Sequence, residues 1–144
     1  MTRRLLLFVA CALPLAACGG NGTNPFTTPS PPPTGSAPYS VTDLRVGTGA
    51  VAVAGQAVTV TYTGWLYSDT EPEHKGTQFD AGTNTRFQLG TLIQGWNLGI
   101  PGMMVGGLRR LVVPPELGYG AAGRLPTIPR DATLLFEIEL ISVP

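Results

Sequence analysis

Residues 90–119 read GTLIQGWNLGIPGMMVGGLRRLVVPPELGY, and this segment decides the fold. Its first apolar residues have helical spacing: Leu92, Ile93, Trp96 and Ile100. This spacing predicts a short helix with one apolar stripe. Gly95 and Gly99 weaken such a helix by about 1 kcal/mol each relative to alanine, so we expect packing to hold it. The helix should end at Pro101, because proline and the glycine after it interrupt helices.

Apolar and polar residues alternate on both sides of this segment, which predicts antiparallel strands. The expected strands are residues 39–46, 57–65, 77–80, 86–89, 107–113 and 133–141, with a turn at 81–85. In the strand 107–113, Leu108, Arg110 and Val112 would share a face, and the sequence leaves open how Arg110 is accommodated. There is no βαβ alternation. The elements therefore predict an α+β fold, an antiparallel β-sheet wrapped on one short α-helix.

Two connecting segments are expected to be loops. Residues 68–75 are polar and contain Pro72, so they should be exposed. His74, the single histidine, has no second histidine or cysteine at metal-ligand spacing, and we expect it to be a solvated surface residue. Residues 114–129 are rich in proline and glycine. A loop of this length inside a compact domain is usually functional.

The N-terminal segment is expected to lie outside the folded domain. Arg3 and Arg4 precede an apolar run, residues 5–13, that is too short to span a bilayer. Residues 15–18, Leu-Ala-Ala-Cys, resemble a bacterial lipobox, so residues 1–17 are interpreted as a lipoprotein signal peptide and Cys18 as the lipidation site. An ordinary secretory signal cut at the same small residues is the alternative. Lipid on Cys18 would anchor the protein to a membrane of the bacterial cell envelope, facing away from the cytoplasm.

Residues 18–38 are interpreted as the lipidated cysteine followed by a tether rich in Pro, Gly and Thr, and residues 39–144 as the folded domain. The tether has one bulky apolar residue, Phe26, so it cannot bury enough surface to offset its ordering entropy. A proline-motif ligand for a partner is the alternative interpretation of this segment.

Charge and cysteine content exclude several classes of function. Removing Arg3 and Arg4 from nine basic residues leaves seven against nine acidic ones, which does not suggest a nucleic-acid partner. The clustered pair Arg109 and Arg110 fits a solvated edge or a cross-strand pair. With Cys11 in the signal peptide and Cys18 lipidated, the mature domain has no thiol for a disulfide or for catalysis. No metal or cofactor motif is present, so we expect neither.

With thiol, metal and cofactor chemistry excluded, the remaining candidates for a functional site are aromatic and aliphatic residues that could form a pocket: Tyr62, Phe79, Phe87, Ile93, Trp96, Tyr119, Ile128 and Phe136. Asp80 stands out among the carboxylates, although a turn cap is its alternative role. Such a pocket suits rotation about an X-Pro bond, whose barrier of about 18–20 kcal/mol comes from amide resonance. The twisted amide is less polar than the planar one, so a dry aromatic pocket favours it without acid–base chemistry.

Six motifs follow one another along residues 39–141: VTVTYTGWL (58–66), QFD (78–80), FQLG (87–90), IQGW (93–96), LGYG (117–120) and IPRDATLLFEIEL (128–140). Together they resemble the FK506-binding (FKBP) family of peptidyl-prolyl cis-trans isomerases. The resemblance implies Trp96 as the pocket floor and places the aromatic walls on Tyr62, Phe79 and Phe136. It implies that Ile93 offers its backbone N–H, and Tyr119 its hydroxyl, to substrate carbonyls. Asp80 joins the polar contacts, and Phe87, Leu92 and Ile128 complete the substrate-binding set.

The chain departs from the family pattern at the rim, where residues 79–90 are shorter than usual and the tip 124–127 (Arg-Leu-Pro-Thr) is unusual. The shortened rim favours a non-catalytic envelope chaperone that holds proline-containing segments in the same pocket. The complete pocket set favours the enzyme. We therefore predict a peptidyl-prolyl isomerase acting on proline-containing polypeptides of the envelope. The resemblance also implies macrolides of the FK506 and rapamycin type as ligands.

Overall fold

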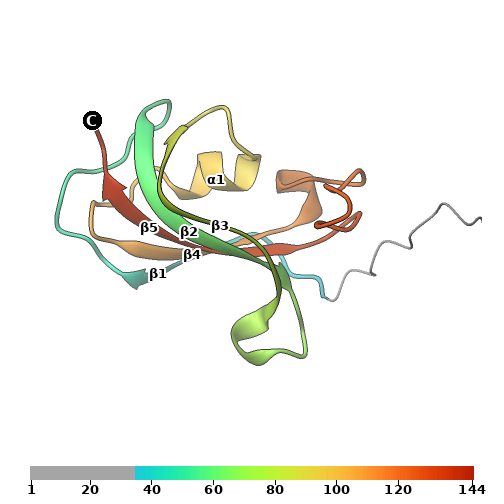
Figure 1. The fold of residues 1–144 in the computed structure, drawn as a ribbon. Helices are drawn as coiled ribbons and strands as arrows, with labels where there is room; N and C mark the ends of the chain where they lie inside the picture. Colours follow the sequence, from blue (N-terminus) through green and yellow to red (C-terminus); the bar gives the residue numbers. More distant parts are fainter. Residues whose placement is uncertain (1–34) are drawn as a thin grey trace, which may run out of the picture.

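The computed structural model describes residues 35–144. In this range one antiparallel sheet has the strand order β1-β4-β5-β2-β3 and carries a short helix on one face (Figure 1). The elements are β1 (Ser40–Arg45), β2 (Ala57–Tyr67), β3 (Lys75–Gln88), α1 (Gln94–Gly99), β4 (Leu108–Val113) and β5 (Leu134–Ser142), with 3-10 turns at Pro72–His74 and Pro115–Leu117. The predicted α+β fold is thus confirmed.

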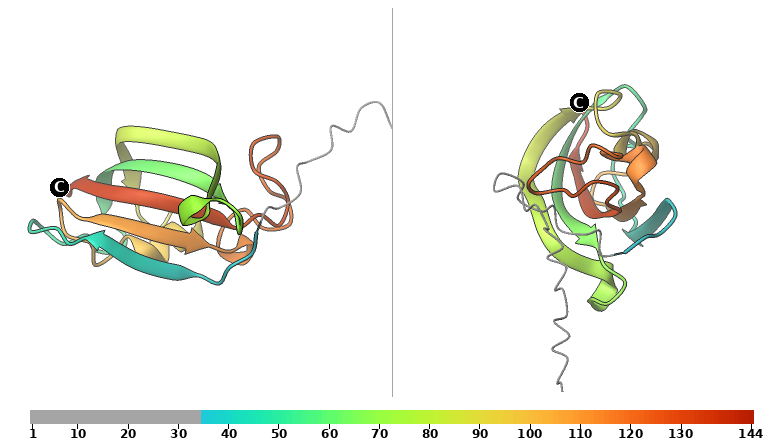
Figure 2. Two further views of the ribbon diagram at one scale, coloured as in Figure 1. Left: turned by 90° about the horizontal axis from the view of Figure 1, so that it is seen from below. Right: turned by 90° about the vertical axis from the view of Figure 1, so that its right-hand side faces the viewer.

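The sheet curves around α1, and the core fills the space between them (Figure 2). Apolar side chains of the central strand β5 face α1: Leu134, Phe136, Ile138 and Leu140. Glu137 and Glu139 alternate with them and lie on the outer face of the sheet. This is the alternation that the sequence predicts for residues 133–141, and it gives the sheet one apolar face and one charged face.

The helix is held in place by its close approach to β4. A Cβ atom on Gly95 would lie 2.6 Å from Cγ1 of Val113, and one on Gly99 would lie 2.5 Å from Cδ2 of Leu111. The two glycines that weaken the isolated helix are therefore required by its packing. Arg109 Nη1 also donates a 2.8 Å hydrogen bond to the Gly99 carbonyl, which satisfies one of the free carbonyls at the helix end.

The prediction of two short strands around a turn at 81–85 is wrong. β3 is continuous and pairs with β2 throughout. Its register shifts between Val60 and Tyr62 of β2, where Asn84 adopts φ 50° and its N–H donates to Thr61 Oγ1 at 3.2 Å. An irregularity within an edge strand carries the same polar and glycine residues as a turn, so sequence alone does not separate the two.

Arg110 is accommodated by charged partners on the outer face. Its Nη2 donates to Glu137 Oε1 of β5 at 2.6 Å and to Glu73 Oε2 at 3.1 Å, and Lys75 pairs with the same two carboxylates. The neighbouring Arg109 pairs with Asp43 of β1. Both arginines thus form cross-strand ion pairs. This agrees with the second interpretation of the sequence, a cross-strand pair, and not with a solvated edge.

The segment 68–75 is folded back against the outer face. The His74 ring is stacked on Tyr67, with centroids 4.8 Å apart and an interplanar angle of 12°, and its Nδ1 lies 3.1 Å from the Ser68 carbonyl oxygen. His74 is exposed, as expected, but it packs on the domain. A small second cluster on this face contains Tyr67, Val112 and Leu135, and Ala37 packs against it.

The predicted signal peptide, Cys18 and most of the predicted tether lie outside the described residues, and the domain boundary at residue 39 stays a prediction. Within residues 35–144, no helix has the length and apolar character needed to cross a bilayer.

Candidate functional site

A cavity of about 140 Å³ opens beside α1, on the face of the sheet that carries the core. Residues from β2, β3, the segment before α1, α1 itself, β5 and the loop after β4 line it: Tyr62, Phe79, Asp80, Phe87, Leu92, Ile93, Trp96, Tyr119, Arg124 and Phe136. These include every predicted site residue of the domain except Ile128. Residues that are far apart in the sequence are therefore brought together around one hollow.

The floor of the cavity is Trp96, which is 5% exposed. Its ring makes edge-to-face contacts with Tyr62, Phe87 and Phe136, at centroid distances of 5.1, 5.4 and 5.2 Å and interplanar angles of 81°, 85° and 86°. Each such pair contributes about 0.5–1.5 kcal/mol beyond burial of area. The buried indole N–H has no hydrogen-bond acceptor among the described residues, so it is an unpaired donor within an otherwise aromatic floor.

One wall depends on a glycine of β2. Phe79 and Phe136 meet edge to face, with centroids 5.6 Å apart and an interplanar angle of 87°. A Cβ atom on Gly64 would lie 2.7 Å from Cζ of Phe79 and 2.9 Å from Cε1 of Phe136. Real side chains do not pack this closely, so the two rings can keep their positions only if residue 64 has no side chain.

The polar side of the cavity is a fixed hydrogen-bonded pair. The Tyr62 hydroxyl donates to Asp80 Oδ2 at 2.9 Å, and the backbone N–H of Ala81 donates to Asp80 Oδ1 at 2.9 Å. Burial, followed by the hydrogen bond to Asp80, raises the pKa of Tyr62 to about 12, so this hydroxyl remains protonated at neutral pH. Both carboxylate oxygens of Asp80 are occupied. Asp80 therefore acts as a fixed acceptor within the continuous strand β3.

Among the residues that line the cavity, the Tyr119 hydroxyl and the backbone N–H of Ile93 are donors that have no partner in residues 35–144. Ile93 is the residue immediately before α1, and the first N–H groups of a helix have no acceptor within the helix. Both donors are thus free to bind carbonyl groups of a ligand. Their roles in substrate binding stay predictions.

Asn97 and Arg124 belong to the site but were not singled out from the sequence. Asn97 Nδ2 donates to the Leu92 carbonyl at 2.8 Å, and its Oδ1 accepts from the Gly90 N–H at 2.8 Å, so it fixes the loop that carries Leu92. The available signal for Asn97 was a polar residue directly after Trp96 in the predicted helix. Arg124 lines the cavity directly. Its signal was a charged residue at the unusual loop tip.

Ile128, expected to contact substrate, does not line the cavity. It is 1% exposed and packs in the core beneath the loop. The reason is a tight turn, in which the Arg124 and Ile128 backbones exchange two 2.9 Å hydrogen bonds. This turn directs Ile128 inward and places Arg124 at the cavity.

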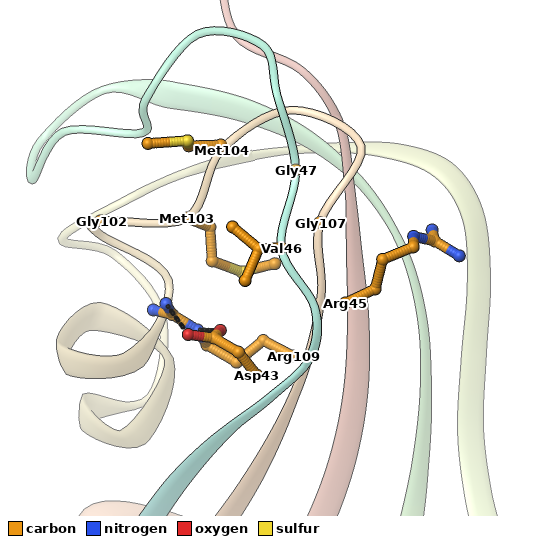
Figure 3. Close-up of a pocket in the computed structure, with 9 residues that line it drawn as sticks. All are labelled: Asp43, Arg45, Val46, Gly47, Gly102, Met103, Met104, Gly107 and Arg109. Atoms are coloured by element: carbon orange, nitrogen blue, oxygen red, sulfur yellow. Dashed lines mark hydrogen bonds and ion pairs between the residues drawn. The ribbon is translucent and has the colours of Figure 1, made fainter.

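A second, smaller hollow of about 60 Å³ lies at the end of β1 (Figure 3). Its lining residues are Asp43, Arg45, Val46, Gly47, Gly102, Met103, Met104, Gly107 and Arg109. The charge of Arg109 is already matched by Asp43 through two hydrogen bonds, and Arg45 points away from the hollow. Hydrogen bonds from Arg109 hold the pKa of Asp43 below its usual range. This hollow is therefore part of the ion-paired edge of the sheet.

The described residues contain no group of three or more His, Cys, Asp or Glu side chains placed to hold a metal ion. The aromatic cavity combines an aromatic floor, the hydrogen-bonded pair of Tyr62 and Asp80, the donors of Tyr119 and Ile93, and the cation Arg124. It can bind and orient an amide, and no lining residue is a cysteine or histidine that could attack it or exchange protons with it near neutral pH.

Comparison with known proteins assigns the family. Residues 49–141 match the family model described as FKBP-type peptidyl-prolyl cis-trans isomerase. An FK506-binding protein of Neisseria meningitidis is 44% identical over 109 residues, which cover 72% of this chain and 94% of that protein. The crystal structure of a peptidyl-prolyl cis-trans isomerase from Pseudomonas syringae is similar with a TM-score of 0.64 and 38% identity, covering 73% of this chain and 74% of that one. The crystal structure of FkpA from Escherichia coli is similar with a TM-score of 0.63 and 35% identity. The match covers 73% of this chain and 47% of that one. This chain therefore belongs to the family of FKBP-type peptidyl-prolyl cis-trans isomerases.

Proposed function

We propose that this isomerase accelerates rotation about X-Pro bonds in proteins of the bacterial cell envelope, and that the aromatic cavity is where it does so. The observation that carries the proposal is the combination of an aromatic Trp96 floor with the unpaired donors Ile93 N–H and the Tyr119 hydroxyl. A proline ring fits an apolar floor, and its flanking carbonyls need donors.

The mechanism requires no proton transfer. The prolyl ring would lie on Trp96, and the two donors would bind carbonyls on either side of the rotating bond. Near the top of the barrier the amide loses conjugation and polarity, so a dry site stabilises it relative to the planar ground state. The pair of Tyr62 and Asp80 presents a fixed polar edge against which the twisted amide is oriented.

The test is a coupled assay of cis-to-trans conversion in X-Pro tetrapeptides, with and without FK506. We expect acceleration by the protein and competitive inhibition by FK506, because a macrolide that mimics a proline segment would occupy the same cavity. A folded protein that binds proline-containing peptides without accelerating their isomerisation would support the non-catalytic chaperone instead.

We further propose that Cys18 carries lipid and anchors the domain to an envelope membrane on its extracytoplasmic side. The sequence Leu-Ala-Ala-Cys at residues 15–18, after a short apolar run, supports this proposal. Mass spectrometry of the mature N-terminus should show an acylated Cys18. An unmodified cysteine, or an N-terminus elsewhere, would contradict it.

A further inference from the structure

Arg124 is the cationic side chain among the residues that line the aromatic cavity. Its charge is close enough to act on the Tyr62 hydroxyl, where it opposes the rise in pKa caused by burial and by Asp80. The side chain itself is exposed at the mouth of the cavity. A ligand bound on Trp96 would therefore lie near the positive charge of Arg124 at the mouth of the cavity.

The backbone of Arg124 is held rigidly although its side chain is exposed. Its N–H donates to the Ile128 carbonyl at 2.9 Å, and its own carbonyl accepts from Ile128 N–H at 2.9 Å and from the Thr127 hydroxyl at 3.0 Å. Ile128 is buried in the core and anchors the turn. The backbone of Arg124 is thus already ordered, so binding of a partner orders only the side chain.

Arg124 forms no ion pair with any described residue, whereas most other cations in residues 35–144 do: Arg45 with Glu139, Arg109 with Asp43, and Lys75 and Arg110 with Glu73 and Glu137. The carboxylate of the cavity, Asp80, accepts hydrogen bonds from the Tyr62 hydroxyl and from the Ala81 N–H. Arg86 and Arg130 also have no ion pair, but neither lines the cavity. Arg124 is therefore the free cation at the site.

We propose that Arg124 is a specificity residue that makes this isomerase prefer proline segments with Asp or Glu beside the proline. The inference rests on the proposed function of the same cavity. A guanidinium presents paired N–H donors that match the two oxygens of a carboxylate. Because the pair would be partly exposed, its effect on rate is moderate and depends on salt.

The experiment compares kcat/KM for two matched pairs of tetrapeptides, with Glu or Gln either directly before or directly after the proline. We expect the wild type to favour Glu over Gln about two- to fivefold in at least one pair, the range expected of an exposed ion pair. This ratio should fall as salt rises from about 0.05 to about 0.5 M. Arg124→Gln should bring the ratio to about one, and Arg124→Glu should reverse it. Arg130→Gln is the control, since it removes the same charge beside the same loop and should keep the wild-type ratio.

A wild-type Glu-to-Gln ratio of one in both pairs of peptides overturns the role of Arg124, and so does a ratio that Arg124→Gln leaves unchanged. In either case, acceleration of the peptides still supports the proposed function. An equal fall of the ratio in Arg130→Gln also overturns it, because net charge would then explain the preference. If no peptide is accelerated, the proposed function fails instead. The same peptides are then compared by calorimetric binding, and equal affinities for Glu and Gln overturn the inference in that case as well.

Discussion

The Tyr62 hydroxyl donates a 2.9 Å hydrogen bond to Oδ2 of Asp80, and this bond joins neighbouring strands β2 and β3 at the edge of the cavity. Asp80 is thereby held in one orientation, with its other oxygen on Ala81 N–H. We predict that Tyr62→Phe lowers kcat/KM by about tenfold or more, because a hydrogen bond to a charged group contributes about 1.5–3 kcal/mol. The coupled tetrapeptide assay measures this. An unchanged kcat/KM would show that the orientation of Asp80 does not matter to the reaction.

Tyr62→Phe should also change how the stability of the protein depends on pH in the alkaline range. The pKa of Tyr62 rises from its ordinary value of 10.0 to about 12 in the folded protein, through burial first and the bond to Asp80 second. A pKa raised by folding means that the hydroxyl contributes stability below pH 10 and that this contribution is lost as the pH rises toward about 12. The difference in unfolding free energy between wild type and Tyr62→Phe should therefore shrink over that interval. A constant difference would contradict the raised pKa.

The pH dependence of activity gives the second prediction. No histidine or cysteine lines the cavity, and His74 lies on the outer face, stacked on Tyr67. We expect kcat/KM to be nearly constant between about pH 6 and about pH 8, the range in which a histidine would titrate. His74→Ala should leave kcat/KM unchanged, although losing the ring stack should lower the melting temperature slightly. A bell-shaped profile, or a folded but inactive His74→Ala protein, would contradict a mechanism without proton transfer.

The outer face provides a third prediction, on stability alone. Burial raises the pKa of Glu137, but hydrogen bonds from Arg110 and Lys75 outweigh it and lower this pKa overall. A pKa lowered by folding means stability that is present above the ordinary value of 4.5 and lost as the pH falls through the folded value. Glu137→Gln should therefore lower the unfolding free energy at pH 7 and reduce its acid dependence, with kcat/KM unchanged.

Glu139→Gln is the matched control on the same strand. Its pair with Arg45 is more exposed, with side-chain exposures of 37% and 54% against 18% and 23% for Glu137 and Arg110. Exposed pairs contribute about 0–1 kcal/mol, so the control should change stability less. Equal effects of the two substitutions would show that the pairing of Glu137 with both Arg110 and Lys75 adds nothing to the unfolding free energy.

Sequence patterns predicted those parts of the fold that have a strict period. The alternation in β5 and the helical spacing of Trp96 and Ile100 each place one face in the core, and burial leaves little choice of register. Edge strand β3 lacked such a period, because its irregular centre is exposed and makes few apolar contacts. Sequence therefore described it as two strands and a turn.

The aromatic residues could be grouped from sequence, and the structure places them around one cavity, while their role in substrate binding stays a prediction. Ile128 and Arg124 show the limit. Which of two residues in a tight turn faces the core depends on backbone hydrogen bonds between 124 and 128, and these leave no trace in hydropathy. The sequence also did not show that the packing of α1 requires Gly95 and Gly99, because this requirement comes from the short distance between the helix and the sheet.

Trp96 gives the fourth prediction, through a pair of substitutions. Trp96→Ala removes a ring that contacts three other aromatics and should cost about 3–5 kcal/mol of stability together with most of the activity. Trp96→Phe keeps an aromatic floor and removes an N–H that has no acceptor among the described residues, so it should cost much less stability. Chemical denaturation measures both. Equal losses would mean that a phenyl ring cannot replace the indole at this position.

Tyr119 separates binding of substrate from maintenance of the fold, because its hydroxyl has no partner in residues 35–144 while its ring lines the cavity. Tyr119→Phe should therefore leave the unfolding free energy within about 0.5 kcal/mol of the wild type, as for substitutions that remove no internal contact. The variant should nevertheless lower kcat/KM by about fivefold, the value of one hydrogen bond of about 1 kcal/mol to a substrate carbonyl. Tyr62→Phe is the matched comparison, since it removes the same atom from a hydroxyl that is bonded within the protein. It should lower both stability and activity, whereas Tyr119→Phe lowers activity alone. If Tyr119→Phe retains full activity, the carbonyl of the substrate is bound elsewhere and the assignment of Tyr119 fails.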